Sequence, residues 1–197
     1  MRRKAAGTLR VTATGASAHS GSAPEKGRNA LLALARTAEA VAALHDPAGP
    51  ARLTAVPTVI RSGDAFNVVP ADGELFCDLR ADDIAAFHSV LAAVPGEVGG
   101  ATLRADLVRL WPGMDTREAA APVLGAATGR LGRDVVGMER GGASDASHVA
   151  SAVPVTIDGL GPRGGGAHSP SEYVVASTLR ERAEVALAVA AAALEPR

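Results

Sequence analysis

The sequence predicts a mixed α/β (α+β) protein, in which a ferredoxin-like βαββαβ sandwich is followed by a partial α/β portion. Alternating apolar residues mark four strand-like segments within the first 110 residues. Two segments with apolar residues at helical spacing separate those strands in the order that this sandwich requires. Beyond them, helical stretches alternate with short apolar runs that are too few to form an independent doubly wound sheet.

The first strand and the first helix have the clearest patterns. In residues 7–17, Leu9, Val11 and Ala13 alternate with polar residues, which is typical of a half-buried strand. Residues 28–44 carry apolar side chains every three or four positions, so we expect an amphipathic helix there. Its expected apolar face consists of Leu31, Leu34, Ala35, Ala38, Val41 and Ala42.

Two more strands, a second helix and a last strand complete the predicted sandwich. Residues 52–63 read as a strand, and Pro57 within them favours an edge position or an irregular start. Residues 66–81 should be its partner, residues 82–94 a helix with an aspartate cap, and residues 101–110 the last strand. One face of the 66–81 strand is expected to carry Leu75, Cys77 and Leu79.

The rest of the chain predicts helices at residues 116–131, 142–151 and 175–194, with short strands at 134–138 and 153–161. These two short strands are too few for a sheet of their own and are more typical of one part of a larger sheet. Because apolar strands need neighbours, we expect an oligomer that forms through exposed sheet, through the first portion, or through both.

Composition excludes several classes of protein. The 197 residues are 47% hydrophobic and carry a net charge of −1, so the chain has no electrostatic footprint for nucleic acid. We find no run of apolar residues long enough to span a membrane. A single cysteine, Cys77, allows no internal disulfide, which fits a cytoplasmic protein.

Two histidines lie in loops where chemistry is possible. His168 follows a glycine-rich loop, where it would be either a zinc ligand beside Glu172 or an exposed turn residue. A zinc site needs three or four protein ligands, and the sequence has no H-E-x-x-H, H-x-H or C-x-x-C motif. His19 follows the first strand, where it would either donate a hydrogen bond to an oxyanion or stand exposed.

Further candidates are a glycine, an arginine and an asparagine. Gly142, in the stretch GGASDA, could offer a backbone N–H to an anionic ligand, whereas Ser144 and Asp145 beside it read as a plain helix cap. Asn67 and Arg80 bracket the third strand, and Arg80 would either clamp a carboxylate or be a solvated charge.

Five motifs in order resemble one family: GASAHSGSAPEKGRNAL, NVVP, DLR, GGASDA and GLGPRGGGAHSPSEYV. They resemble the zinc metallopeptidases that include glutamate carboxypeptidase, aminoacylase, acetylornithine deacetylase and succinyl-diaminopimelate desuccinylase. The resemblance implies a ferredoxin-like dimerisation (lid) domain at residues 7–109 and the C-terminal portion of a zinc-hydrolase catalytic domain at 110–197. It also implies hydrolysis of an amide bond, often beside a substrate carboxylate, with two bridged zinc ions.

The resemblance assigns roles to five residues. His168 matches the family's C-terminal zinc ligand, and His19 matches the lid histidine that reaches into the partner subunit's active site to stabilise the tetrahedral intermediate. Asn67 and Arg80 match lid residues that help to bind the substrate. Gly142 lies in the matching loop of the substrate pocket.

The sequence departs from that family in one respect. Its first half, with an H-x-D pair, a Glu-Glu pair and a further carboxylate ligand, has no equivalent here. We therefore expect little or no zinc on this chain alone, and no hydrolase activity without a partner.

That departure leads to two candidate partners for the chain and to two alternative hypotheses for its function. The partner would be a second copy joined through the lid, or a separate N-terminal half, and the intact enzyme would take a small-molecule amide substrate. One alternative is a non-catalytic dimerisation or ligand-binding module derived from the family. Another is an unrelated ferredoxin-like small-molecule binder.

Overall fold

A computed structural model describes residues 1–195, which form two compact units. The first unit comprises residues 4–113 and 141–143. The second comprises residues 1–3, residues 114–140 and the chain from residue 144 onward.

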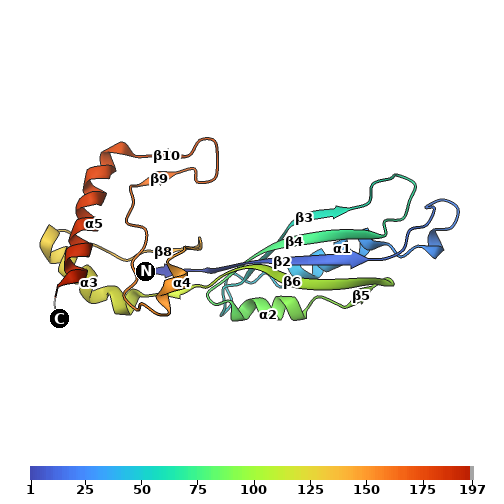
Figure 1. Cartoon of the computed structure of the whole chain (residues 1–197), viewed down its shortest axis with the longest axis horizontal. Coiled ribbons are helices and arrows are strands. Elements are labelled where there is room, and N and C mark those ends of the chain that lie inside the picture. The colour runs from blue at the N-terminus through green and yellow to red at the C-terminus, as the bar shows by residue number, and fades with distance from the viewer. Residues whose placement is uncertain (196–197) are drawn as a thin grey trace. The chain divides into compact units, whose positions relative to one another are not determined.

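An antiparallel five-stranded sheet with two helices forms the first unit, as Figure 1 shows. Its strand order is β3-β4-β2-β6-β5, and the helices are α1 and α2. This confirms the predicted fold class, with the short β5 added before the last strand. The elements are β2 (Ala5–Thr14), the 3-10 turn η1 (Pro24–Lys26), α1 (Ala30–Ala42), β3 (Thr54–Ser62), β4 (Asp72–Ala81), α2 (Ala85–Ala92), β5 (Glu97–Val98) and β6 (Ala101–Trp111).

The core of the first unit lies between this sheet and its two helices. Strand alternation places one set of side chains inside: Leu9 and Val11 from β2 are fully buried, and so are the three predicted residues of β4. Phe87 and Val90 of α2 pack into the same cluster. The predicted inward residues of both strands are therefore confirmed.

The buried face of α1 differs from the predicted one. Leu34 and Val41 are buried as expected, but Leu31 is 38% exposed. The small side chains of Ala30 and Ala33 are buried instead, because only such residues allow the helix backbone to come close to the sheet. The helix begins at the cap Asn29, whose side chain accepts a hydrogen bond from the Leu32 amide.

Pro57 lies where the sequence placed it, in a strand at the edge of the sheet. Among the described strands β3 pairs only with β4, and the register between them shifts between Pro57 and Val59. A proline has no N–H to donate to a second neighbour, so the edge position costs no hydrogen bond. The predicted aspartate cap of the second helix is displaced: α2 begins after Ile84 without a side-chain cap, and the Asp83 carboxylate accepts from the Ala85 amide at 2.7 Å.

The second unit is built on two packed helices. Val123 and Ala127 of α3 meet Val185, Ala188 and Val189 of α5 in a small apolar core. Its elements are β1 (Arg2–Arg3), β7 (Met114–Asp115), α3 (Arg117–Leu131), β8 (Glu139–Arg140), α4 (Ser147–Ala150), β9 (Gly164–Gly165), β10 (Tyr173–Val174), the 3-10 turn η2 (Ala176–Thr178) and α5 (Leu179–Leu194).

Two predicted strands of this unit are absent from the described chain. Residues 134–138 and 153–161 form no ladder, although both carry the apolar residues that suggested strands. A strand exists only where a neighbour accepts and donates its backbone hydrogen bonds. The Arg2 amide donates to the Met138 carbonyl at 3.4 Å beside β8, but within residues 1–195 no strand pairs along either segment, so both predictions were wrong for this chain.

No helix among the described residues is long and apolar enough to cross a membrane.

Candidate functional site

His19 lies in a loop that is fastened to the segment before β4. The loop begins at Gly15, where a side chain is impossible because a Cβ would lie 1.9 Å from the Arg28 carbonyl oxygen. The Ser20 amide then donates to the Asn67 carbonyl at 3.0 Å, and His19 forms a bridge with Val68. These backbone bonds bring His19 and Asn67 to the same end of the sheet.

The His19 ring is exposed, but its Nδ1 atom is well supplied with donors. The amides of Gly21 and Ser22 donate to Nδ1 at 3.1 and 3.2 Å, and the Ser22 hydroxyl lies 2.9 Å from it. Nε2 is the other ring nitrogen and the one that an external group can meet. Sequence reasoning did not single out Ser22; the signal was the small, polar H-S-G-S stretch, which lets the loop turn back on the histidine.

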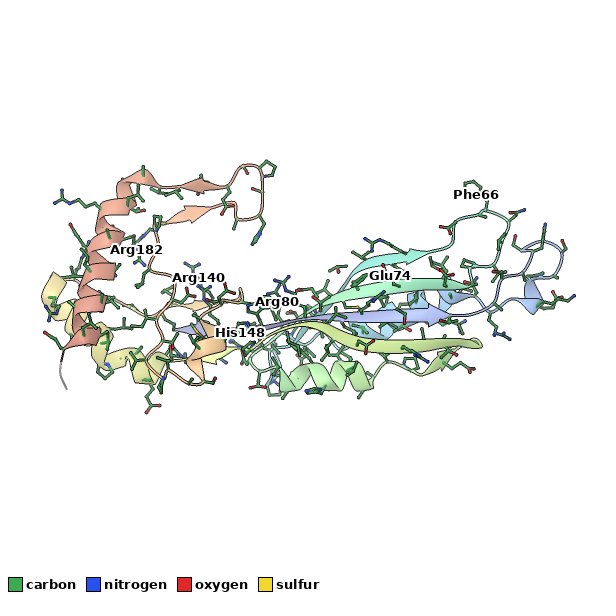
Figure 2. The ribbon with its side chains drawn as sticks, in the orientation of Figure 1. Phe66, Glu74, Arg80, Arg140, His148 and Arg182 are labelled. Carbon is green, nitrogen blue, oxygen red and sulfur yellow. The ribbon has the colours of Figure 1, made fainter. Side chains whose placement is uncertain are left out.

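Arg80 lies at the opposite end of β4 from this loop. Arg80 comes eight positions after Asp72, which corresponds to about 27 Å along a strand. Figure 2 shows Phe66, the neighbour of Asn67, at one end of the sheet and Arg80 at the other. Asp78, two residues away on the same face, accepts from Nε and Nη2 of Arg80 at 2.9 and 3.0 Å.

The structure therefore brings together two of the predicted lid residues and separates the third. His19 and Asn67 share one end of the sheet, whereas Arg80 is too far along β4 to reach the same small ligand. Arg80 is about one-third exposed and already paired with Asp78, so it can meet an added carboxylate only by sharing or exchanging that partner.

Gly142 lies in an exposed bend that belongs to the same compact unit as the sheet. A Cβ added there would meet nothing within 4 Å, so the position does not need a glycine for lack of space. The predicted helix cap beside it is displaced: α4 begins after Ala146 without a side-chain cap, and the Ser144 hydroxyl accepts from the Ala146 amide instead.

In the second unit, His168 stands in the turn that connects β9 with β10. Its backbone has a φ of 64°, in the left-handed region. The Ser169 hydroxyl donates to the Gly166 carbonyl at 2.7 Å, which closes the turn, and a Cβ on Gly165 would press on the Tyr173 ring. Both His168 and Glu172 are exposed.

The described residues do not fit a zinc site by themselves. Within residues 1–195, no three side chains of His, Cys, Asp or Glu lie close enough together to hold a metal ion. A zinc ion bound by protein needs at least three ligands in a tetrahedral arrangement, with second-shell partners that orient them. Among the described residues, His168 therefore belongs to no cluster of three metal-ligating side chains.

The strongest electrostatic feature of the second unit involves Asp158, which sequence reasoning missed. Burial opposes the charge of this carboxylate, but the hydrogen bond from Ser144 and the Arg3 guanidinium hold its pKa below its ordinary value. Arg3 donates from Nε at 2.8 Å and lies 2.6 Å away through Nη2. The two residues are 155 positions apart, so no local pattern could have paired them.

A cavity of about 460 Å³ lies in the same unit. Its walls include Val135 and Met138 from one of the unpaired apolar segments and Ile157 and Leu160 from the other. Both segments thus line a cavity among the described residues.

Known proteins resemble this chain over most of its length. Residues 1–101 match the M20 peptidase dimerisation domain. Carboxypeptidase G2 from a Pseudomonas species is 28% identical over 184 residues, which are 88% of this chain and 44% of that protein.

Solved structures share the fold. Aminopeptidase PepT from Bacillus cereus superposes with a TM-score of 0.77 at 20% identity, covering 98% of this chain and 53% of that one. A tripeptidase from Staphylococcus aureus gives the same TM-score and identity over 95% of this chain and 51% of its own. The chain thus spans about half the length of the proteins that it matches.

Proposed function

Because the chain belongs to the M20 peptidase family through its dimerisation domain, we propose that it contributes a lid and part of the catalytic domain to a zinc-dependent amidohydrolase or carboxypeptidase. The bond cleaved would be an amide next to a substrate carboxylate. In this proposal residues 7–109 are the lid and residues 110–197 the C-terminal portion of the catalytic domain, and the protein works in the cytoplasm.

One observation carries the proposal: the predicted lid residues lie at opposite ends of a single sheet. His19 and Asn67 share one end, and Arg80 lies about 27 Å away along β4. One chain therefore cannot bring all three to one small substrate. Two copies related by a two-fold axis can, if the first end of one lid meets the second end of the other.

The roles follow from the chemistry of each side chain. Arg80 would bind the substrate carboxylate, which matches the planar fork of a guanidinium. His19 of the second copy would donate a hydrogen bond to the oxyanion of the tetrahedral intermediate, with Asn67 beside it as a further polar contact. Gly142 would offer its backbone N–H from the loop of the substrate pocket.

His168 is proposed as one metal ligand of the assembled enzyme. The other ligands and the general base would come from a polypeptide that carries the H-x-D and Glu-Glu pairs, because residues 1–195 hold no three-ligand cluster. Without that polypeptide we expect this chain to bind little or no zinc and to hydrolyse nothing.

The test compares the purified chain alone with the chain mixed with such a polypeptide, encoded upstream or in a neighbouring reading frame. Zinc content and hydrolysis of N-acyl amino acids and of peptides ending in glutamate are measured for each. We expect activity only in the mixture, with a loss of about 10²–10³ in kcat on His19→Ala. Hydrolysis by the chain alone, abolished by His168→Ala, would refute the proposal.

A second candidate is a binding or dimerisation module without chemistry. The bidentate pair of Arg80 with Asp78 favours it, since a satisfied guanidinium is less available for a substrate. In that case the chain would dimerise, and no added polypeptide would produce turnover.

A further inference from the structure

Three hydrogen-bond donors surround Nδ1 of His19, and they have a consequence for its chemistry. The donors are the Gly21 amide at 3.1 Å, the Ser22 amide at 3.2 Å and the Ser22 hydroxyl at 2.9 Å. We propose that Ser22 and these two amides are positioning groups that hold His19 in the tautomer with its proton on Nε2. This inference rests on the proposed role of His19 and specifies it.

The tautomer follows from what the donors are. A backbone N–H can only donate, so a ring nitrogen that faces two of them must offer a lone pair. A neutral imidazole carries one proton, which is then on Nε2. The Ser22 hydroxyl can turn either way, and beside an unprotonated Nδ1 it donates.

The fixed tautomer limits what His19 can do. An Nε2–H group is a hydrogen-bond donor, suited to a carbonyl oxygen or an oxyanion. It has no lone pair in the ring plane, so in this state it neither takes a proton from water nor binds a metal ion. The geometry thus favours transition-state stabilisation over general-base catalysis or metal ligation for this residue.

The hydrogen bonds that fix the His19 tautomer all lie within one loop. Its donors come two and three residues after the histidine, and the loop itself is held by the Ser20 amide, which donates to the Asn67 carbonyl. No part of the second unit takes part. The tautomer is therefore expected in the isolated chain, whether or not a catalytic partner is bound.

The experiment is nitrogen-15 NMR of the histidine rings in the full chain at about pH 8, where imidazoles are ordinarily neutral. His45 and His88 serve as internal references, because both are exposed and no hydrogen bond reaches their rings from residues 1–195. We expect His19 to show a protonated Nε2 and a hydrogen-bonded, unprotonated Nδ1, with a more extreme tautomer ratio than either reference.

Variants of the neighbouring serines sharpen the test. Ser22→Ala removes one of three donors that share a single lone pair, so the ratio should fall by up to about fivefold. Ser22→Thr keeps the hydroxyl and should restore the tautomer ratio of the unchanged protein. Ser20→Ala, a matched control at the residue after His19, keeps the amide that holds the loop and should leave the tautomer ratio unchanged. A protonated Nδ1, or a ratio equal to that of His45 and His88, would overturn the inference.

This readout separates the inference from the proposed function. If the tautomer is fixed but His19→Ala leaves hydrolysis by the assembled enzyme unchanged, only the proposed function fails. If His19→Ala abolishes hydrolysis while Nδ1 carries the proton, only this inference fails.

Discussion

Asp158 connects the first strand of the second unit, β1, to the loop that follows α4. Its side chain is 24% exposed and accepts from Arg3 through two guanidinium nitrogens. Burial raises the cost of its charge, but Ser144 and Arg3 more than offset that cost, so the pKa lies below the ordinary value of 3.8. A carboxyl group with a depressed pKa stabilises the fold above its unfolded pKa, and this stabilisation is lost as the pH falls through the folded value.

Replacing this carboxylate should therefore have a pH-dependent effect. We expect Asp158→Asn to lower the free energy of unfolding by about 1–3 kcal/mol at neutral pH, because the Arg3 charge loses its partner. The difference from the unchanged protein should shrink below about pH 4. Urea unfolding at a series of pH values measures both, and Asp134→Asn, at an exposed site in the same unit, is the control.

Cys77 should be unreactive while the first unit stays folded. Its side chain is fully buried in β4, and burial raises the pKa of the thiol to about 11. The thiolate is the nucleophile, so at pH 8 a disulfide reagent should react only when the sheet opens. We expect the labelling rate to rise with urea together with unfolding; rapid labelling in buffer alone would contradict the buried position.

Single site residues could be proposed from the sequence, but their grouping could not. Motif order singled out His19, Asn67 and Arg80 without placing the first two together and the third apart. That grouping depends on backbone bonds between the loop of residues 15–29 and the segment before β4. Ser22 and the Arg3–Asp158 pair were missed because their significance lies in three-dimensional contacts.

Among the elements, prediction succeeded where an element's partners lie within the chain. β2 and β4 pair along ten residues each, and their alternation reports a real buried face. The apolar pattern of residues 134–138 and 153–161 indicates only that the side chains of these segments are suited to burial against another element. The pattern does not identify that element, so it predicted strands that have no paired strand within residues 1–195.

Amide hydrogen exchange should distinguish the paired strand β2 from the unpaired apolar segments 134–138 and 153–161. Amides in β2 are expected to exchange slowly, because both of its edges are paired. Amides in residues 134–138 and 153–161 should exchange at least about a hundredfold faster in the isolated chain, since they have no ladder to open. If the polypeptide that completes the enzyme pairs with them, adding it should slow their exchange while β2 stays unchanged.

At the scale of the whole molecule, the five-stranded sheet separates the proposed site residues into two sets at its opposite ends. β4 is continuous between them, and it is paired on both sides by β2 and β3. Such a strand cannot fold back to bring Arg80 to His19. In the proposed function, a shared site therefore requires a second copy, and a two-fold pair would have two equivalent sites, each with one residue set from either chain.

This arrangement predicts complementation between two inactive variants. Chains with His19→Ala keep Arg80, and chains with Arg80→Ala keep His19. In a mixed pair, one site receives both intact side chains and the other receives neither. Random pairing of equal amounts makes half of the dimers mixed, so the mixture should recover about a quarter of the unmodified activity. The assay uses the reconstituted hydrolase, with each variant alone as the baseline.

The control for complementation is a pair of changes at the same end of the sheet. His19→Ala mixed with Asn67→Ala should recover nothing, because both residues come from the same chain at each site and every site then lacks one of them. Recovery in this control equal to that in the first mixture would mean that the two ends of the lid do not serve different sites. Failure of both mixtures would place all three residues in one subunit's site, against the length of β4.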